Sequence, residues 1–488
     1  MTSRPNILLI LTDQHAAHVS GFGGNAHAST PHLDRLAERS TSFEAAYCQT
    51  PLCVPSRMSF LSGKWACNCG AWDNSAVLFD QHTTLPAWLA QHGYTTAAVG
   101  KMHFRGAEQM HGFQTRPYGD LVESRFPGHQ PDPPETADGR WNKHAVGRFP
   151  FSGTTAIPES MLIDNVVTSE SLAWLLEQYD AEPDTPWFFM ASYSRPHFPL
   201  TAPGRYIRKA MRSDLHLPSL PPGYPGVLHP HDRFIVDDFE LTRFANDEQR
   251  RALVAYYACV EFVDDCIGRL LDGLAQAGAL DNTYVVYTTD HGEMAGEHGL
   301  WWKRTYYDES ARVPLLVSGP GLPAGVESCP VELLDLFPTF CDWAEIEPPE
   351  GLDGESLDSL LTGRPERRHK RFARSELLGE REETRFRMVR DERWKWVEFP
   401  TSPARLFDLQ ADPHERVDWA EDPPPDAPVD QLHTLLAQGL TWEELSVRRA
   451  DDRRRTGSLE PLSQGAVQYR LSNGRIIEAD AHLYPPND

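Results

Sequence analysis

Acidic, amide and imidazole side chains follow short apolar segments of this chain, and their types are suited to binding a metal ion. Asp13 and Gln14 come directly after the apolar run 6–12, and Asp290 and His291 come after a second such run. Carboxylate and amide oxygens are the ligands that Ca²⁺ and Mg²⁺ prefer, and an imidazole completes such a set. The alternative is that each acid is an ordinary loop residue at the end of a strand. The pattern favours a site for one divalent cation.

Cys53 stands at the predicted start of a helix. Pro55 suits the first turn, and the helix is expected from about Ser56 to Leu61, with Gly63 ending it. Backbone N–H groups and the helix dipole favour an anion at this end, and Arg57 lies one turn further on, where its guanidinium can reach the same anion. The segment therefore predicts a nucleophile beside an oxyanion site. The alternative for Cys53 is an ordinary buried thiol.

Two more groups follow predicted strands. Lys101 and His103 are two positions apart on an extended segment, so their side chains point to the same side and can reach one oxyanion. His197 comes just past the end of the apolar run 187–193. The alternatives are a solvated lysine beside a packed histidine, and a histidine whose ring is satisfied by backbone groups.

Alternating strand-like and helix-like segments must position these side chains. Apolar runs typical of buried strands cover 6–12, 94–99, 187–193, 283–289 and 310–317. Helical patterns cover 30–39, 85–93, 160–179, 248–277 and 332–340. In open α/β sheets, functional groups gather at the carboxyl ends of the strands. Residues 114–158 and 200–236 are expected to be long loops, the first of them a wall of the substrate pocket.

Composition limits the partners. The 488 residues carry a formal net charge of −24, which excludes nucleic acid and anionic membranes as expected partners. The eight cysteines are scattered, so no disulfide framework is predicted, and Cys67 and Cys69 lack a second pair for a zinc site. No signal peptide or membrane-spanning run is visible, so the cytoplasm is the expected location.

The sequence pattern of the chain changes near residue 366. Segments 384–390 and 394–399 predict a hairpin, 422–428 a Pro-rich linker, and 429–438 and 442–454 two short helices. We expect a catalytic α/β domain over 1–365 and an antiparallel subdomain over 366–421. The linker, short helices and polar tail occupy 422–488, a candidate for oligomer contacts.

Three motifs carry a family resemblance. The run Cys53-Val-Pro-Ser-Arg57 resembles the Cys-x-Pro-x-Arg signature of the type I sulfatases, in the alkaline phosphatase superfamily. Gly100-Lys-Met-His103 resembles a second sulfatase signature, and Asp290-His-Gly-Glu293 resembles the metal-binding stretch of the superfamily. The pair Asp13-Gln14 resembles the choline sulfatase-like and phosphonate monoester hydrolase-like branches, and the stretch 101–113 looks most like choline sulfatases. The resemblance spans roughly 5–415.

This resemblance implies a fold and a chemistry. The fold is α/β, a mainly parallel sheet between helices with a smaller antiparallel C-terminal subdomain. A formylglycine-generating enzyme oxidises Cys53 to formylglycine, whose hydrate attacks a small-molecule sulfate ester. One cation, Ca²⁺ before Mg²⁺ or Mn²⁺, is held by five residues: Asp13, Gln14, Cys53, Asp290 and His291. The family also suggests a homo-oligomer.

The resemblance also assigns roles around the ester. Arg57 and Lys101 neutralise its oxygens, and His103 takes the proton whose loss expels sulfate. His197 or Lys303 protonates the leaving alcohol, the latter resembling the family's second substrate lysine. Asn74 either donates to a sulfuryl oxygen or is a structural turn asparagine.

Two rival functions stay open. The first is a phosphonate monoester or phosphodiester hydrolase with the same nucleophile and metal. The second is a binding protein that keeps Cys53 unmodified. The alcohol is not readable, because the stretch 101–113 suggests a small alkyl sulfate but no aromatic cage for a quaternary ammonium is evident. An aryl sulfate is equally open.

Overall fold

The computed structural model describes residues 4–106, 108–116, 120, 149–379, 381–437, 440–457, 466–470 and 476–480. Its central sheet has seven strands in the order β10-β2-β9-β8-β1-β6-β4. The strands are β1 (Asn6–Asp13), β2 (Thr41–Phe43), β4 (Thr95–Gly100), β6 (Trp187–Pro196), β8 (Thr283–Thr289), β9 (Leu315–Ser318) and β10 (Gly325–Glu327). The neighbours β8, β1, β6 and β4 are mutually parallel, whereas β9 runs antiparallel to β8 and β2.

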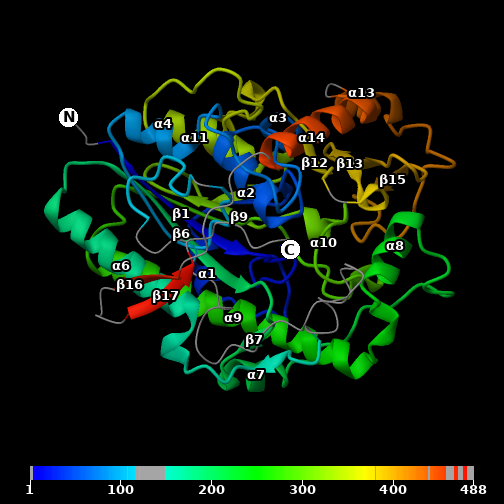
Figure 1. Cartoon of the computed structure of the whole chain (residues 1–488), viewed down its shortest axis with the longest axis horizontal. Coiled ribbons are helices and arrows are strands. Elements are labelled where there is room, and N and C mark those ends of the chain that lie inside the picture. Colours follow the sequence, from blue (N-terminus) through cyan, green and yellow to red (C-terminus); the bar gives the residue numbers. More distant parts are fainter. Residues whose placement is uncertain are drawn as a thin grey trace.

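Two apolar layers cover the sheet, because alternate residues of its buried strands face opposite sides. On β1, Leu8 and Ile10 belong to one core cluster, while Leu9 and Leu11 belong to the other. The first layer contains α1 (Pro31–Ala37), α6 (Ile163–Ala181) and α9 (Asn246–Gln276). The second contains α2 (Cys53–Ser62), α4 (Leu85–Gln91) and α11 (Leu336–Trp343). Figure 1 shows these two groups of helices on opposite sides of the sheet.

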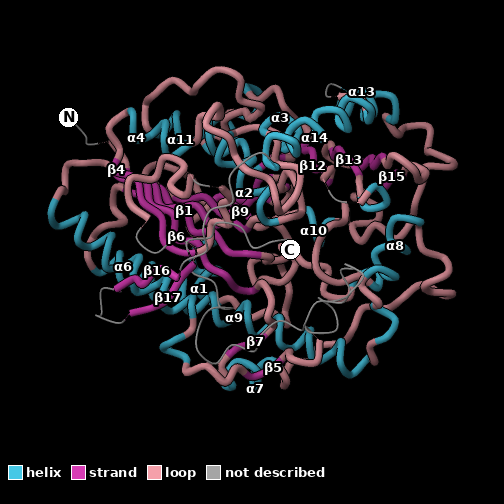
Figure 2. Tube along the Cα trace, in the orientation of Figure 1, coloured by secondary structure: helices cyan, strands magenta, loops and turns pink. Residues whose placement is uncertain are grey.

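A second, smaller sheet stands beside the first (Figure 2). Its four antiparallel strands are β12 (Ala373–Leu377), β13 (Phe386–Arg390), β14 (Trp394–Glu398) and β15 (Arg405–Asp408). Leu432 and Leu436 of α13 (Val429–Ala437) pack against Val389 and Trp394 of this sheet. The predicted α/β fold class, with its antiparallel C-terminal sheet, is confirmed.

The described chain contains further helices and strands. They are β3 (Ala46–Tyr47), α3 (Ala66–Cys69), β5 (Gly153–Thr154), β7 (Thr201–Ala202), α7 (Gly204–Ala210), α8 (Pro230–Asp238), α10 (Asp308–Ala311), β11 (Val331–Glu332), α12 (Asp358–Leu361), α14 (Trp442–Gly457), β16 (Ala466–Arg470) and β17 (Ile476–Asp480). No helix in these described segments is long and apolar enough to cross a membrane. All eight cysteines are buried free thiols.

Two local predictions were wrong. The segment 200–236 is not one long loop, because it contains α7 and α8, whose apolar side chains Tyr206 and Ile235 are buried. The strand predicted over 310–317 begins only at Leu315, because α10 occupies the preceding residues. Most of the predicted loop 114–158 lies outside the described residues.

Candidate active site

Parallel strands bring the chemical groups to one edge of the central sheet. Asp13 ends β1, Lys101 follows β4, His197 follows β6 and Asp290 follows β8. Because β8, β1, β6 and β4 are neighbours with the same direction, their carboxyl ends meet at this edge. Helix α2 begins at Cys53, three residues earlier than the sequence suggested, and ends at Ser62, with Gly63 as its C-cap at a φ of 64°.

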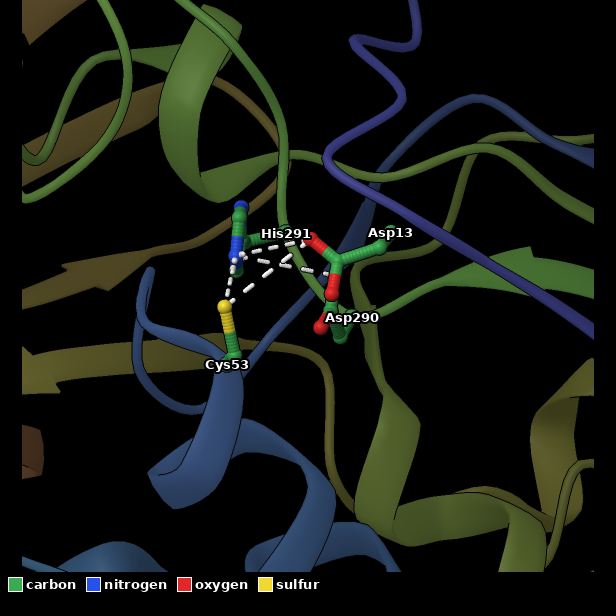
Figure 3. A group of neighbouring side chains, drawn as sticks. All are labelled: Asp13, Cys53, Asp290 and His291. Carbon is green, nitrogen blue, oxygen red and sulfur yellow. Dashed lines mark hydrogen bonds and ion pairs between the residues drawn. The ribbon is translucent and has the colours of Figure 1, made fainter. Parts of the chain in front are cut away.

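Four fully buried side chains converge there: Asp13, Cys53, Asp290 and His291 (Figure 3). Each offers an atom within 4.8 Å of the corresponding atoms of the others. His291 Nε2 lies 3.3 Å from Cys53 Sγ, while Nδ1 of the same ring lies 3.0 Å from the carbonyl of Gly292. A proton on Nδ1 satisfies that carbonyl, so the lone pair of Nε2 faces the group.

Gln14 adds an amide oxygen beside this group. Its φ is 70°, in the left-handed region that few non-glycine residues adopt, and strain of this kind gathers at functional sites. The backbone N–H of Gln14 donates to Asp290 Oδ1 at 3.1 Å, and its side-chain Oε1 accepts from Lys303 Nζ at 2.7 Å. Two carboxylates, an amide oxygen and an imidazole fit a hard divalent cation.

Arg57 contacts both carboxylates of this group. The guanidinium is fully buried and donates to Asp290 Oδ2 at 2.8 Å and to Asp13 Oδ2 at 3.1 Å. Its remaining donors reach the carbonyl of Lys101 and the hydroxyl of Ser192. The structure shows Arg57 holding both carboxylates, and contact of its guanidinium with an ester oxygen stays a prediction.

Two lysines set the charge around the thiol. Lys101 Nζ lies 2.7 Å from Asp13 Oδ2, and Lys303 Nζ lies 3.2 Å from Cys53 Sγ. Burial disfavours the thiolate, but the ammonium groups of Lys303 and Lys101 outweigh it and hold the pKa of Cys53 well below its ordinary value. Burial lowers the pKa of Lys303 itself, whereas Asp13 raises the pKa of Lys101 against its burial. The environment therefore stabilises negative charge on residue 53.

Two histidines flank the thiol in neutral form. His197 Nδ1 lies 2.8 Å from the carbonyl of Phe198, as the backbone alternative predicted, but its Nε2 still lies 3.9 Å from Asp13 Oδ1. Burial and the nearby ammonium groups lower the pKa of His197 to about 3. Burial also lowers the pKa of His103, whose φ is 59° and whose backbone N–H donates to Asp120 Oδ2 at 2.7 Å.

Asn74 supports the start of helix α2. Its Oδ1 accepts from the backbone N–H of Val54 at 3.1 Å, while donation from its Nδ2 to a sulfuryl oxygen stays a prediction. Its backbone carbonyl accepts from Arg105 Nε at 2.9 Å, and the same guanidinium lies 3.3 Å from His103 Nε2. Asn74 therefore links the Cys53 helix to the segment that carries His103.

Sequence reasoning missed several supporting residues. Arg105 stands two positions after His103, and Glu293 ends the Asp-His-Gly-Glu motif, so both carried a local signal. Ser192 and Asp120 gave none, because their contacts depend on segments distant in the chain. The ring of Phe198 lies 5.3 Å from the Lys303 ammonium and forms an aromatic surface beside it.

This fold and site define a hydrolase of the alkaline phosphatase superfamily. The sequence profile of the Sulfatase family matches residues 5–346, and that of the N-sulphoglucosamine sulphohydrolase C-terminal region matches 296–441. The chain therefore belongs to the Sulfatase family.

Individual relatives agree with this assignment. The chain is 34% identical to the choline-sulfatase of Rhizobium meliloti, over 93% of this chain and 90% of the relative. It is 28% identical to an arylsulfatase of Clostridium perfringens, over 90% of this chain and 95% of the relative. Among solved structures, the phosphonate monoester hydrolase of Silicibacter pomeroyi superposes with a TM-score of 0.73 at 26% identity, covering 99% of this chain and all of that one. The family implies a metal ion and a formylglycine, and the buried Asp, Cys, Asp and His group offers the residues for both.

Proposed function

We propose that the protein hydrolyses a sulfate monoester to an alcohol and sulfate, using formylglycine formed at Cys53 and one divalent cation. The observation that carries this proposal is the position of Cys53 at the start of α2, with Lys303 Nζ at 3.2 Å and His291 Nε2 at 3.3 Å from its Sγ. When bound, the cation would be held by Asp13, Gln14, Asp290 and His291 and would neutralise ester charge, while the aldehyde hydrate would supply the nucleophilic oxygen.

The other residues around Cys53 are proposed to keep the metal ligands ionised and to accept a proton. Lys101 and Arg57 keep Asp13 ionised, since their positive charges hold its pKa below the ordinary value despite burial and the nearby Cys53. Burial lowers the pKa of His103, so its imidazole is neutral near neutral pH. A neutral imidazole can accept a proton, which is the role proposed for His103.

The leaving alcohol needs a proton donor, and Lys303 is the better candidate. A buried lysine with a lowered pKa releases its proton more readily than an ordinary one. The His197 imidazole, with a pKa of about 3, holds no second proton near neutral pH. Lys303 is therefore the proposed acid, and His197 is proposed to orient the leaving group.

A second candidate is hydrolysis of a phosphonate monoester or phosphodiester. It is supported by the similarity to the phosphonate monoester hydrolase fold of Silicibacter pomeroyi. These esters carry one negative charge, like a sulfate monoester, whereas a phosphate monoester carries up to two. The positive charges of the site are one divalent cation, Arg57, Lys101 and Lys303, and they are balanced by the carboxylates of Asp13 and Asp290. We therefore expect singly charged esters to be preferred, with the sulfate ester first.

The test is kcat/KM for one aryl leaving group carried on sulfate, phosphonate monoester, phosphodiester and phosphate monoester. Each tenfold preference corresponds to about 1.4 kcal/mol of transition-state binding, so side activities should be measurable. If kcat/KM is higher for the phosphonate monoester or the phosphodiester than for the sulfate, the second candidate function replaces the first. A higher kcat/KM for the phosphate monoester would refute the charge argument. An unmodified Cys53 together with no turnover of any ester would favour the binding protein.

The substrate alcohol is proposed only as a class. Two of the relatives are named choline-sulfatase and arylsulfatase. A panel of small alkyl and aryl sulfates therefore covers both expectations.

A further inference from the structure

Glu293 is a buried carboxylate two residues beyond His291, and the proposed chemistry leaves it without a task. Its Oε1 accepts the backbone N–H of Ala295 at 3.0 Å and also that of Trp302. Its Oε2 accepts from the side-chain Nε2 of Gln14. Because burial of a carboxylate is costly unless its oxygens are satisfied, this arrangement fixes the carboxylate in one orientation.

Gln14 is held at its other polar groups as well. Its carbonyl accepts from the hydroxyl of Tyr256 at 2.8 Å, and that hydroxyl also accepts from the backbone N–H of Ala16 at 2.8 Å. Its own backbone N–H binds Asp290. The backbone of Gln14 is thus fixed, and the remaining freedom of this residue is the rotation of its terminal amide.

The hydrogen-bond partners decide which way that amide points. With Nε2 directed at Glu293, Oε1 is directed at Lys303 Nζ and toward the side of Cys53. In the opposite orientation, two oxygens would face each other at Glu293 and two donors would face each other at Lys303. Glu293 therefore selects the orientation that offers an oxygen to the site.

We propose that Glu293 is a positioning residue that fixes the Gln14 amide so that its oxygen, not its nitrogen, faces the divalent cation. This inference rests on the proposed cation site and goes beyond it by assigning a role to a residue outside the ligand set. An amide nitrogen in that place would present N–H donors to a cation, and these repel it.

The substitution Glu293→Gln tests this directly because it keeps the shape and removes one acceptor. The remaining oxygen stays on the backbone N–H groups of Ala295 and Trp302, so the new NH₂ faces Gln14. The amide of Gln14 must then rotate, which turns its nitrogen toward the cation position. The double change Gln14→Glu with Glu293→Gln restores a donor–acceptor pair and again directs an oxygen into the site.

The experiment is calorimetric titration of the chelator-treated full chain with Ca²⁺ and, separately, with Mn²⁺. We expect Glu293→Gln to weaken cation binding by roughly 10- to 100-fold, the usual effect of losing a partner that orients a ligand. The double variant should bind with at least wild-type affinity. Glu297→Gln is the matched control, since Glu297 is on the same segment but pairs with Arg416 at 3.2 Å, and its affinity should stay within about twofold.

The outcomes separate this role from the cation site itself. A wild-type chain that binds neither ion would refute the site and this role together. Wild-type affinity in a folded Glu293→Gln variant would refute only the role of Glu293. If that single variant does not fold, the double variant decides: binding supports the pairing, and a folded double variant that fails to bind overturns it.

Discussion

The indole N–H of Trp72 donates to Oδ2 of Asp452 at 2.9 Å, across 380 positions of the chain. The next residue of helix α14, Arg453, reaches the carboxylate of Asp73 at 2.5 Å. Asn74 follows directly and accepts from the first turn of the helix that carries Cys53. A helix near the end of the chain thus holds the segment that supports the start of α2.

This relationship predicts that Arg453→Met lowers activity more than stability. The Arg453 side chain is half exposed, and such ion pairs contribute about 0–1 kcal/mol to folding, so the melting temperature should fall by no more than about 2 °C. Loss of its contact with Asp73 should let the segment around Asn74 move, and we expect kcat/KM to fall about three- to tenfold. Arg454→Met is the control, since Arg454 pairs with Asp451 inside the same helix. Equal kcat/KM in both variants would contradict the prediction.

The second prediction concerns the chemistry of residue 53. In active protein, peptide mass spectrometry should show that Cys53 has lost its sulfur and gained an aldehyde. Cys53→Ala should abolish turnover with the fold intact. Cys341→Ala, which removes another buried free thiol within the core, should cost stability but retain the ester specificity. Full activity with an unmodified thiol at 53 would rule out formylglycine.

The third prediction separates the two candidate acids. If Lys303 protonates the leaving alcohol, Lys303→Ala should slow poor leaving groups by about 10²- to 10⁴-fold and activated phenols much less. His197→Ala should slow all leaving groups by a similar factor. The measurement is the slope of log kcat/KM against leaving-group pKa for a series of sulfate esters. The reverse pattern would assign the acid role to His197.

The fourth prediction concerns stability against pH. Asp264 of α9 accepts from the backbone N–H groups of His32 and Leu33, and burial raises its pKa to about 7. The native state therefore holds this proton more tightly than the unfolded chain, whose aspartate pKa is about 4. This contribution to stability is complete below the unfolded pKa and is lost as the pH rises from about 4 to about 7.

Asp264→Asn removes this pH dependence because its side chain stays neutral. We compare the melting temperature of the variant minus that of the wild type at two pH values. This difference should be about 1–3 °C more positive at pH 8 than at pH 5. Asp272→Asn, an exposed change on the same helix, should show no such difference. A shift for Asp264→Asn that is equal at both pH values would show that the carboxyl does not titrate in this range.

The sequence predicted the parts of the site that depend on local patterns. Asp13 and Asp290 were recognisable because each follows a continuous apolar run, which is typical of a buried parallel strand. The hairpin of β13 and β14 was recognisable from alternating segments around a short turn. Residues 204–210 were misread because their proline- and glycine-rich surroundings hid a short helix stabilised by packing on α9.

Contacts between distant segments could not be predicted. Nothing near Trp72 indicates that Asp452 binds it, and nothing near Arg57 indicates that its guanidinium would bridge two carboxylates. The direction of the Arg57 side chain depends on where β1 and β8 place Asp13 and Asp290, which only the folded sheet determines. Glu293 was visible in its motif, but its partner Gln14 lies 279 positions away.

The bridge made by Arg57 limits the coordination number that the protein can supply to a cation. It occupies Oδ2 of both Asp13 and Asp290, so each carboxylate has one oxygen, Oδ1, on the side of His291. With Gln14 and His291, the chain offers about four donors, whereas Ca²⁺ takes about six to eight. A bound Ca²⁺ would therefore need residue 53, water or the ester to complete its shell. If the ester does so, cation and oxyanion binding are thermodynamically linked, and sulfate should tighten Ca²⁺ binding by the same factor by which Ca²⁺ tightens sulfate binding.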